Sequence, residues 1–80
     1  MIRISKQTRI TPEEIIAKAS DYFGAKGEGL AEKDRNRCCI TFEGAGGYVT
    51  VSVVEENERR IVDVETREFE YQAKQFLNTL

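Results

Sequence analysis

The alternation of apolar and polar residues in the middle of this chain constrains its fold more than any other feature. It runs from Cys38 to Val54 and is broken only by the glycine-rich stretch at 44–47. The inward-facing candidates on its two halves are Cys38, Ile40, Phe42, Val49, Val51 and Val53. Because successive side chains of a β-strand point to opposite faces, this period of two predicts two strands with one buried face. Gly44-Ala45-Gly46-Gly47 predicts a hairpin turn between them.

Two stretches with helical periodicity flank this hairpin. The first begins with Thr11 as the predicted N-cap, Pro12 at the first helical position and Glu14 at the third, which is typical of a capping box. Its apolar stripe is Ile15, Ile16, Ala19, Tyr22 and Phe23, after which Gly24 is predicted to end the helix in a left-handed conformation. The second stripe is Phe69, Ala73, Phe76, Leu77 and Leu80, with Thr66 as the predicted cap. Each stripe predicts a helix that docks on a sheet by one side.

Three weaker strand signals complete the order of elements. Ile2 and Ile4 alternate with polar residues and predict a first strand at an edge of the sheet. We expect a strand at about 28–33, built on Leu30, before a turn at 34–36, and a last strand at about 61–66. The order β-α-β-β-β-β-α predicts an α+β fold, a two-layer sandwich with both helices packed on one face of an antiparallel sheet. The 80 residues show no repeat or linker, so we expect a single domain over residues 1–80.

This order of elements resembles the plan of the TATA-binding-protein half-repeat and, in enlarged form, that of the helix-grip ligand-binding proteins. The resemblance is one of topology over most of the chain and rests on no sequence motif, so it assigns no functional residue. A helix-grip relationship implies a pocket between the sheet and the C-terminal helix. Phe69, Phe76 and Leu77 on the stripe of that helix leave little room for one.

A two-layer plan leaves one face of the sheet without helices, and this face is the predicted contact surface. The residues that alternation places there are Cys39, Thr41, Glu43, Tyr48, Thr50, Ser52, Ile61, Asp63, Glu65 and Arg67. They form a polar surface with apolar islands. A sheet face that simply lies in water explains the same pattern, because antiparallel sheets commonly have one solvated side.

Catalytic signals are weak in this sequence. It contains no histidine, so an enzyme would have to use carboxylates such as Glu43, Asp63 and Glu65, which cross-strand ion pairing also explains. Cys38 and Cys39 are neighbours, so we expect reduced thiols, with Cys38 in the core and Cys39 on the open face. The glycine-rich stretch precedes a strand, whereas a phosphate loop opens a helix. We expect no cofactor and no metal.

Charge and hydropathy indicate whether nucleic acid or a membrane is an expected partner. The chain has 12 basic and 14 acidic residues, a net charge of −2, which does not favour nucleic acid. A nucleic-acid interpretation would need a basic patch at one end of the sheet, made of Arg3, Lys6, Arg9, Lys26, Lys33, Arg35 and Arg37. No stretch is apolar for long enough to span a membrane, and no secretory signal pattern appears at residue 1, so we expect a cytoplasmic protein.

These observations favour a non-catalytic protein-interaction module with the capacity to form a homodimer through the open face or a strand edge. Self-association suits so short a chain, because pairing two copies buries area that one copy cannot bury. The alternative is a small-ligand binder or minor enzyme of the helix-grip type. Weak nucleic-acid binding is the third hypothesis, and the sequence does not decide whether any catalysis occurs.

Overall fold

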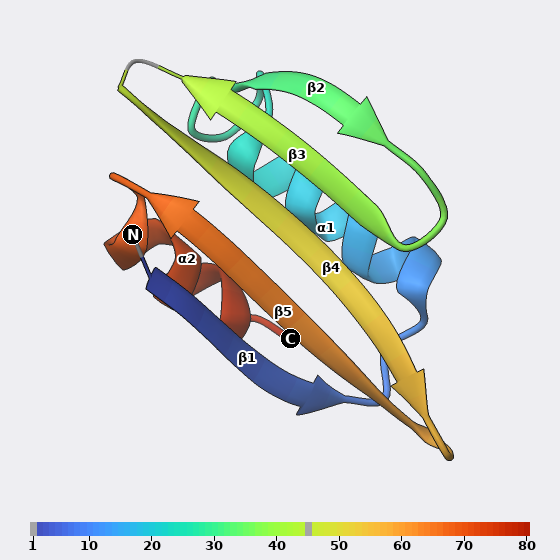
Figure 1. Cartoon of the computed structure of the whole chain (residues 1–80). Coiled ribbons are helices and arrows are strands. Elements are labelled where there is room, and N and C mark those ends of the chain that lie inside the picture. Colours follow the sequence, from blue (N-terminus) through green and yellow to red (C-terminus); the bar gives the residue numbers. More distant parts are fainter. Residues whose placement is uncertain (1, 45) are drawn as a thin grey trace.

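The computed structural model describes residues 2–44 and 46–80, and within them the chain forms five strands and two helices (Figure 1). In chain order the elements are β1 (Ile2–Thr8), α1 (Pro12–Phe23), β2 (Ala31–Arg35), β3 (Cys39–Gly44), β4 (Gly47–Glu56), β5 (Arg59–Arg67) and α2 (Glu70–Asn78). The strands form one antiparallel sheet in the order β1-β5-β4-β3-β2. The predicted α+β order is confirmed.

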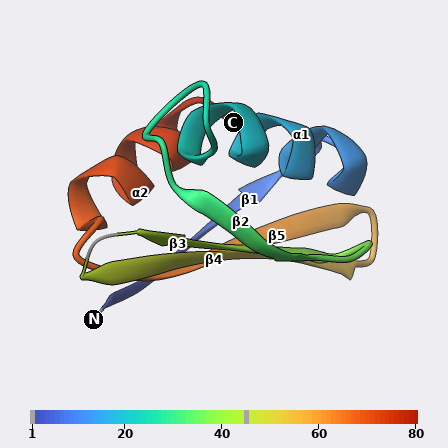
Figure 2. The same cartoon turned by 90° about the horizontal axis from the view of Figure 1, so that it is seen from above.

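Both helices lie on the same side of the sheet, and the opposite side has no helix in the described part of the chain (Figure 2). The three inward valines of β4, Val49, Val51 and Val53, are buried, as predicted. They pack with Val62 and Val64 of β5 in the core. Apolar residues of α1 and α2 cover this core. The ring centroids of Phe23 in α1 and Phe76 in α2 lie 5.4 Å apart. The arrangement leaves the outer face of the sheet as the surface to consider for function.

Helix α1 begins where its capping residues indicate. The Thr11 hydroxyl accepts a hydrogen bond from the backbone N–H of Glu14 at 3.3 Å, and Pro12 is the first helical residue. This contact satisfies one of the amide groups that a helix N-terminus leaves without a partner. The predicted end of the helix is right in position and wrong in conformation, because Gly24 has an extended backbone with φ −77°. The chain therefore leaves α1 without a left-handed residue at that point.

Helix α2 begins later than predicted, and Thr66 is not its cap. Thr66 lies within β5, is fully buried, and donates a hydrogen bond from its hydroxyl to the Tyr48 carbonyl at 2.8 Å. Its side chain continues the inward alternation of Val62 and Val64, which explains why the strand extends this far. Glu68 then turns the chain with φ 76°, and α2 starts after it with no side-chain cap.

Strand β2 lies later in the chain than its predicted position at 28–33. Leu30, the expected centre of that strand, is buried just before β2 begins, and every residue of β2 is exposed. The predicted turn at 34–36 is also wrong, because Asp34 and Arg35 pair with β3. The turn instead centres on Asn36, whose side-chain oxygen accepts hydrogen bonds from the amides of Cys38 and Cys39, both at 3.0 Å. A strand with no buried residue has no alternation by which sequence could locate it.

Strands β3 and β4 meet at the predicted glycine-rich hairpin, of which Ala45 lies outside the described residues. Gly44 pairs with Gly47, and Gly46 has φ 81°, a left-handed conformation that glycine adopts at little cost. The β4–β5 hairpin turns at Asn57, with φ 56°, so β4 extends two residues beyond its predicted end at Val54.

Candidate contact surface

The outer face of the sheet, hereafter the open face, carries all ten residues that alternation placed there. Cross-strand pairing over β3, β4 and β5 arranges nine of them in three rows: Glu43, Tyr48 and Arg67; Thr41, Thr50 and Glu65; and Cys39, Ser52 and Asp63. The tenth, Ile61, pairs with Val54 in a fourth row. Their placement together follows from the register, because directly opposed residues of paired strands share a face. Their role in binding stays a prediction.

The open face also includes residues that the sequence analysis did not assign to it. On β1 these are Arg3, Ser5 and Gln7, which pair with Glu65, Asp63 and Ile61 of β5 in that order. Val54 of β4 pairs with Ile61, and Asp34 of β2 pairs with Thr41. The signal for Val54 was present, because it continues the outward series of Thr50 and Ser52. The pairing of β1 with β5 was not readable from either strand alone.

Charged and polar side chains on this face contact one another. Arg3 forms an ion pair with Asp63, and the Tyr48 hydroxyl donates a hydrogen bond to the Glu65 carboxylate at 2.8 Å. That hydrogen bond is the main cause of a raised Tyr48 pKa, because it favours the neutral phenol. Two of the carboxylates considered for acid–base chemistry are therefore already held by neighbouring side chains.

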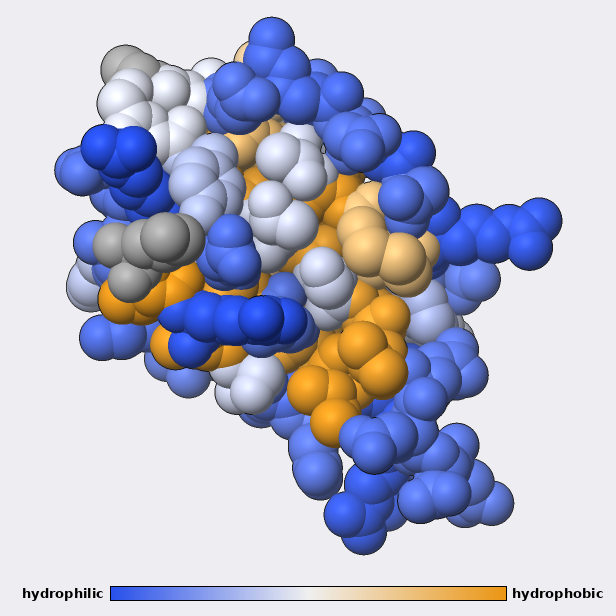
Figure 3. All heavy atoms as spheres, in the orientation of Figure 1, coloured by the Kyte–Doolittle hydropathy of each residue, from blue (hydrophilic) through white to orange (hydrophobic). Residues whose placement is uncertain are grey.

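An apolar patch lies on the half of the open face nearest the β4–β5 hairpin. Val54 is 53% exposed, and Ile61, directly opposite it, is half-buried. Figure 3 looks onto this face and shows apolar and weakly polar side chains along its middle, with hydrophilic ones mainly at the periphery. Val54 and Ile61 thus form a small apolar patch on an otherwise polar face.

Cys38 and Cys39 complete this patch, and here the sequence expectation was wrong. The two residues are joined by a disulfide, and Cys38 is exposed where a core position was predicted. Strand β3 begins only at Cys39, so the alternation that would separate their side chains does not apply to Cys38. The Cys38 carbonyl accepts a hydrogen bond from the Val53 amide at 2.8 Å, which places the disulfide beside β4.

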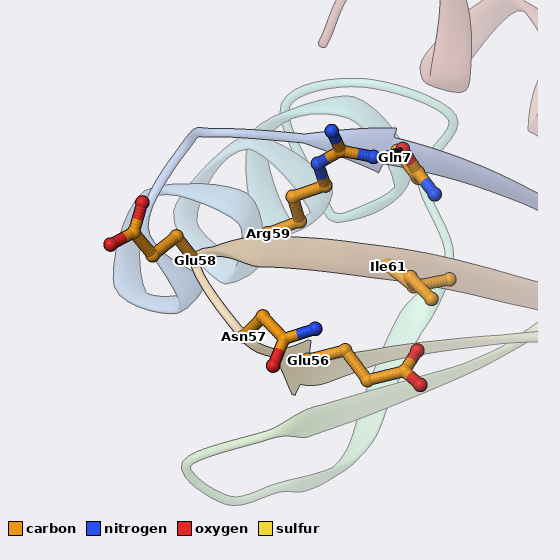
Figure 4. Close-up of a pocket in the computed structure, with 6 residues that line it drawn as sticks. All are labelled: Gln7, Glu56, Asn57, Glu58, Arg59 and Ile61. Carbon is orange, nitrogen blue, oxygen red and sulfur yellow. Dashed lines mark hydrogen bonds between the residues drawn. The ribbon is translucent and has the colours of Figure 1, made fainter.

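A shallow hollow of about 740 Å³ adjoins the apolar patch. Its lining residues are Gln7, Glu56, Asn57, Glu58, Arg59 and Ile61. Figure 4 shows the Arg59 side chain extending toward Gln7, to which it donates a hydrogen bond at 3.4 Å. A second hollow, of about 530 Å³, lies at the other end of the face beside Tyr48 and Arg67. Open-face residues line part of each hollow: Gln7 and Ile61 in the first, Tyr48 and Arg67 in the second.

The space that a helix-grip pocket would occupy is filled in this structure. Ala73 and Phe76 of α2 are fully buried and Leu77 is 6% exposed, while Phe69 packs against the same core. Among the described residues, the four surface hollows that we find have no lining residue from α2. Ligand binding between the sheet and α2 would require this packing to open.

The residues of the proposed basic patch are divided between the two edges of the sheet. Strands β1 and β2, which carry Arg3 and Lys6 on one side and Lys33 and Arg35 on the other, are the two outermost strands. Arg3 pairs with Asp63, Arg35 pairs with Glu32, and Lys6 contacts backbone carbonyls of the last helix. The arrangement gives little support to a continuous phosphate-binding surface.

In residues 2–44 and 46–80, no group of three or more cysteine or acidic side chains could hold a metal ion. Neither helix is long and apolar enough to cross a membrane. In comparisons with known proteins, the chain matches no protein-family model and no curated protein.

Proposed function

We propose that this protein is a non-catalytic interaction module whose contact surface is the open face. The observation that carries the proposal is the absence of any described helix over one side of a five-stranded sheet. The outward residues on that side include an apolar pair, the exposed Val54 and the half-buried Ile61. Sheet faces buried against a partner gain stability from the apolar area that they remove from water. Function therefore resides in the surface rather than in a cavity.

The middle of the open face supports this proposal. The outward residues of β4, from Tyr48 to Val54, are uncharged, so covering them does not require desolvation of a formal charge. The hydroxyls of Thr41 and Thr50 lie 3.2 Å apart and hydrogen-bond each other, which satisfies part of their polar character. Interfaces commonly combine such an uncharged centre with a charged rim.

The arrangement favours the TATA-binding-protein half-repeat plan over the helix-grip plan. A helix-grip protein holds its ligand between sheet and helix, whereas here Phe76 and Leu77 fill that space. A half-repeat plan with closely packed helices leaves the opposite sheet face for recognition. The proposed function follows this second arrangement.

Site-specific photocrosslinking tests the proposal. A photoreactive amino acid replaces Thr50 on the open face in one variant and the exposed Lys18 of α1 in a matched control. In cells, the Thr50 position is expected to give discrete crosslinked species, identified by mass spectrometry, and the Lys18 position is not. A second open-face position, Thr41, should give the same species. Equal crosslinking from Thr50 and Lys18, or none from Thr50, would overturn the proposal.

A further inference from the structure

We propose that the partner of the open face is a second copy of the same chain, packed face to face about a two-fold axis that runs along β4. This inference rests on the proposed function of the open face. Such an axis places β5 of one copy over β3 of the other, and β1 over β2, because these strands lie at equal distances from β4 in the sheet. Each row of paired residues then faces the same row of the other copy in the opposite order, so that its β5 residue faces the β3 residue of the other copy.

Residues on the axis must tolerate contact with themselves. A charged residue there would face an identical charge, which is unfavourable. The outward residues of β4 along the axis are Tyr48, Thr50, Ser52 and Val54, and none carries a charge at neutral pH. The next outward position is Glu56, at the end of the strand, so the symmetric contact ends at Val54.

Charged residues away from the axis meet opposite charges. Arg67 and Glu43 flank Tyr48 in one row, on β5 and β3, so Arg67 of each copy comes over Glu43 of the other. The row that contains Thr50 has Arg3 at one end, on β1, and Asp34 at the other, on β2. Arg3 of each copy therefore comes over Asp34 of the other copy. These two residue pairs give four cross-copy charge pairs, and no like charges are opposed in the rows from Tyr48 to Val54.

The apolar patch lies inside the area that this symmetry covers. Val54 lies on the axis and contacts its own counterpart, and Ile61 comes beside it over the turn that precedes β3. Cys39 shares a row with Ser52 and Asp63 and so comes over Asp63 of the other copy. Val54, Ile61 and Cys39 are the exposed or half-buried apolar groups of the open face. One rotation therefore covers the whole apolar patch.

The face offers the area of a weak contact. Five strands about 4.8 Å apart, covered over the seven residues from Tyr48 to Val54 at roughly 3.3 Å each, give a footprint of roughly 450 Å² per copy. Two copies then bury roughly 900 Å², which is the size of weak and transient interfaces. The two Glu56 residues lie at the exposed end of β4, just beyond Val54, where the contact ends. We expect a dimer of modest affinity.

Charge reversal at Arg67 and Glu43 tests this symmetry directly. R67E places two acids opposite each other at two symmetric positions, and E43R does the same with two bases. Each single variant should raise the dimer dissociation constant at least about tenfold, measured by sedimentation equilibrium from micromolar to millimolar protein. The double variant R67E/E43R should restore wild-type affinity. An equimolar mixture of the two single variants should form a heterodimer, detected by native mass spectrometry.

The matched control is K18E, which makes the same charge change as R67E on the helix side and should leave association unchanged. Failure of the double variant or the mixture to restore the dimer would overturn the inference, as would a wild-type chain that stays monomeric at millimolar concentration. The crosslinking result distinguishes a failure of the proposed dimer from a failure of the proposed function. A monomeric chain that still crosslinks from Thr50 to another species refutes only the second copy, whereas the loss of all Thr50 crosslinks refutes the proposed function as well.

Discussion

The ammonium group of Lys6 donates a hydrogen bond to the carbonyl oxygen of Leu77 at 3.0 Å and so ties the edge strand β1 to the last turn of α2. A second hydrogen bond, to the Leu80 carbonyl, measures 2.8 Å. The last carbonyls of a helix lack intrahelical partners and form the negative end of its dipole, so a cation stabilises them. Lys6, which the sequence suggested for a basic patch, thus helps to hold α2 on the side of the sheet that the helices cover.

Replacing Lys6 by methionine should weaken the fold. The K6M variant keeps the aliphatic stem and loses the contacts of the ammonium with the helix C-terminus, so we expect the free energy of unfolding to fall by about 1 kcal/mol. Urea denaturation followed by circular dichroism measures the change. K18M, at an exposed position of α1, should stay within about 0.5 kcal/mol of wild type. Equal effects of the two variants would show that the Lys6 contacts contribute nothing.

Tyr48 should make stability depend on alkaline pH. Its hydrogen bond to Glu65 raises its pKa in the folded state above the ordinary value near 10. Because the pKa is higher in the folded than in the unfolded chain, the stabilisation is fully present below about pH 10 and is lost as the pH rises through the folded value. Denaturation measured from about pH 8 to about pH 12 should show this loss in wild type. The loss should be smaller in Y48F than in wild type, because the variant lacks the phenol that bonds to Glu65.

The two glycines of the β3–β4 hairpin should respond differently to alanine. At Gly47 an added Cβ would lie 2.1 Å from the Arg67 carbonyl oxygen, so the backbone pairing of β4 with β5 must shift. At Gly46 an added Cβ meets no atom within 4 Å, and the cost is the positive φ alone. We expect G46A to lose about 1 kcal/mol and G47A more than about 2 kcal/mol in thermal or urea unfolding. A G47A variant as stable as G46A would contradict the close approach.

The state of Cys38 and Cys39 can be read from their reaction with an alkylating reagent. Protein purified in air should react at neither cysteine, because both sulfurs are in the disulfide. After treatment with a dithiol reductant both should be alkylated without denaturant, since Cys38 is exposed. In a reducing compartment the pair is expected as two thiols. Two reactive thiols in the air-oxidised protein would refute the disulfide.

Elements with one buried face could be predicted from sequence, and those without a buried face could not. The Thr11 cap and the inward valines of β4 follow directly from local pattern, because capping geometry and alternation act over a few residues. Strand β2 was misplaced because all five of its residues are exposed, so its hydrogen bonds to β3 leave no trace in hydropathy. The misassigned Thr66 shows that strand alternation can extend into a residue that also suits a helix cap.

The composition of the open face was largely predictable, and its organisation was not. Alternation identified its ten predicted residues, yet the strand order that sets β1 beside β5 depends on contacts between the two ends of the chain. That order creates the Arg3–Asp63 ion pair and the exchange of charges about β4. The disulfide was missed for a different reason, because neighbouring cysteines in a regular strand point to opposite faces.

The two copies are expected to meet through the open face and through no other surface. Backbone chemical shifts of the isotopically labelled chain, recorded from micromolar to millimolar concentration, locate the residues that take part in the contact. Concentration-dependent shifts are expected at Thr41, Thr50, Ser52, Val54 and Ile61, with the exposed residues of α1 and α2 unchanged. Shifts confined to the helices or to the edge of β2, or no shifts at any concentration, would show that the open face does not make the contact.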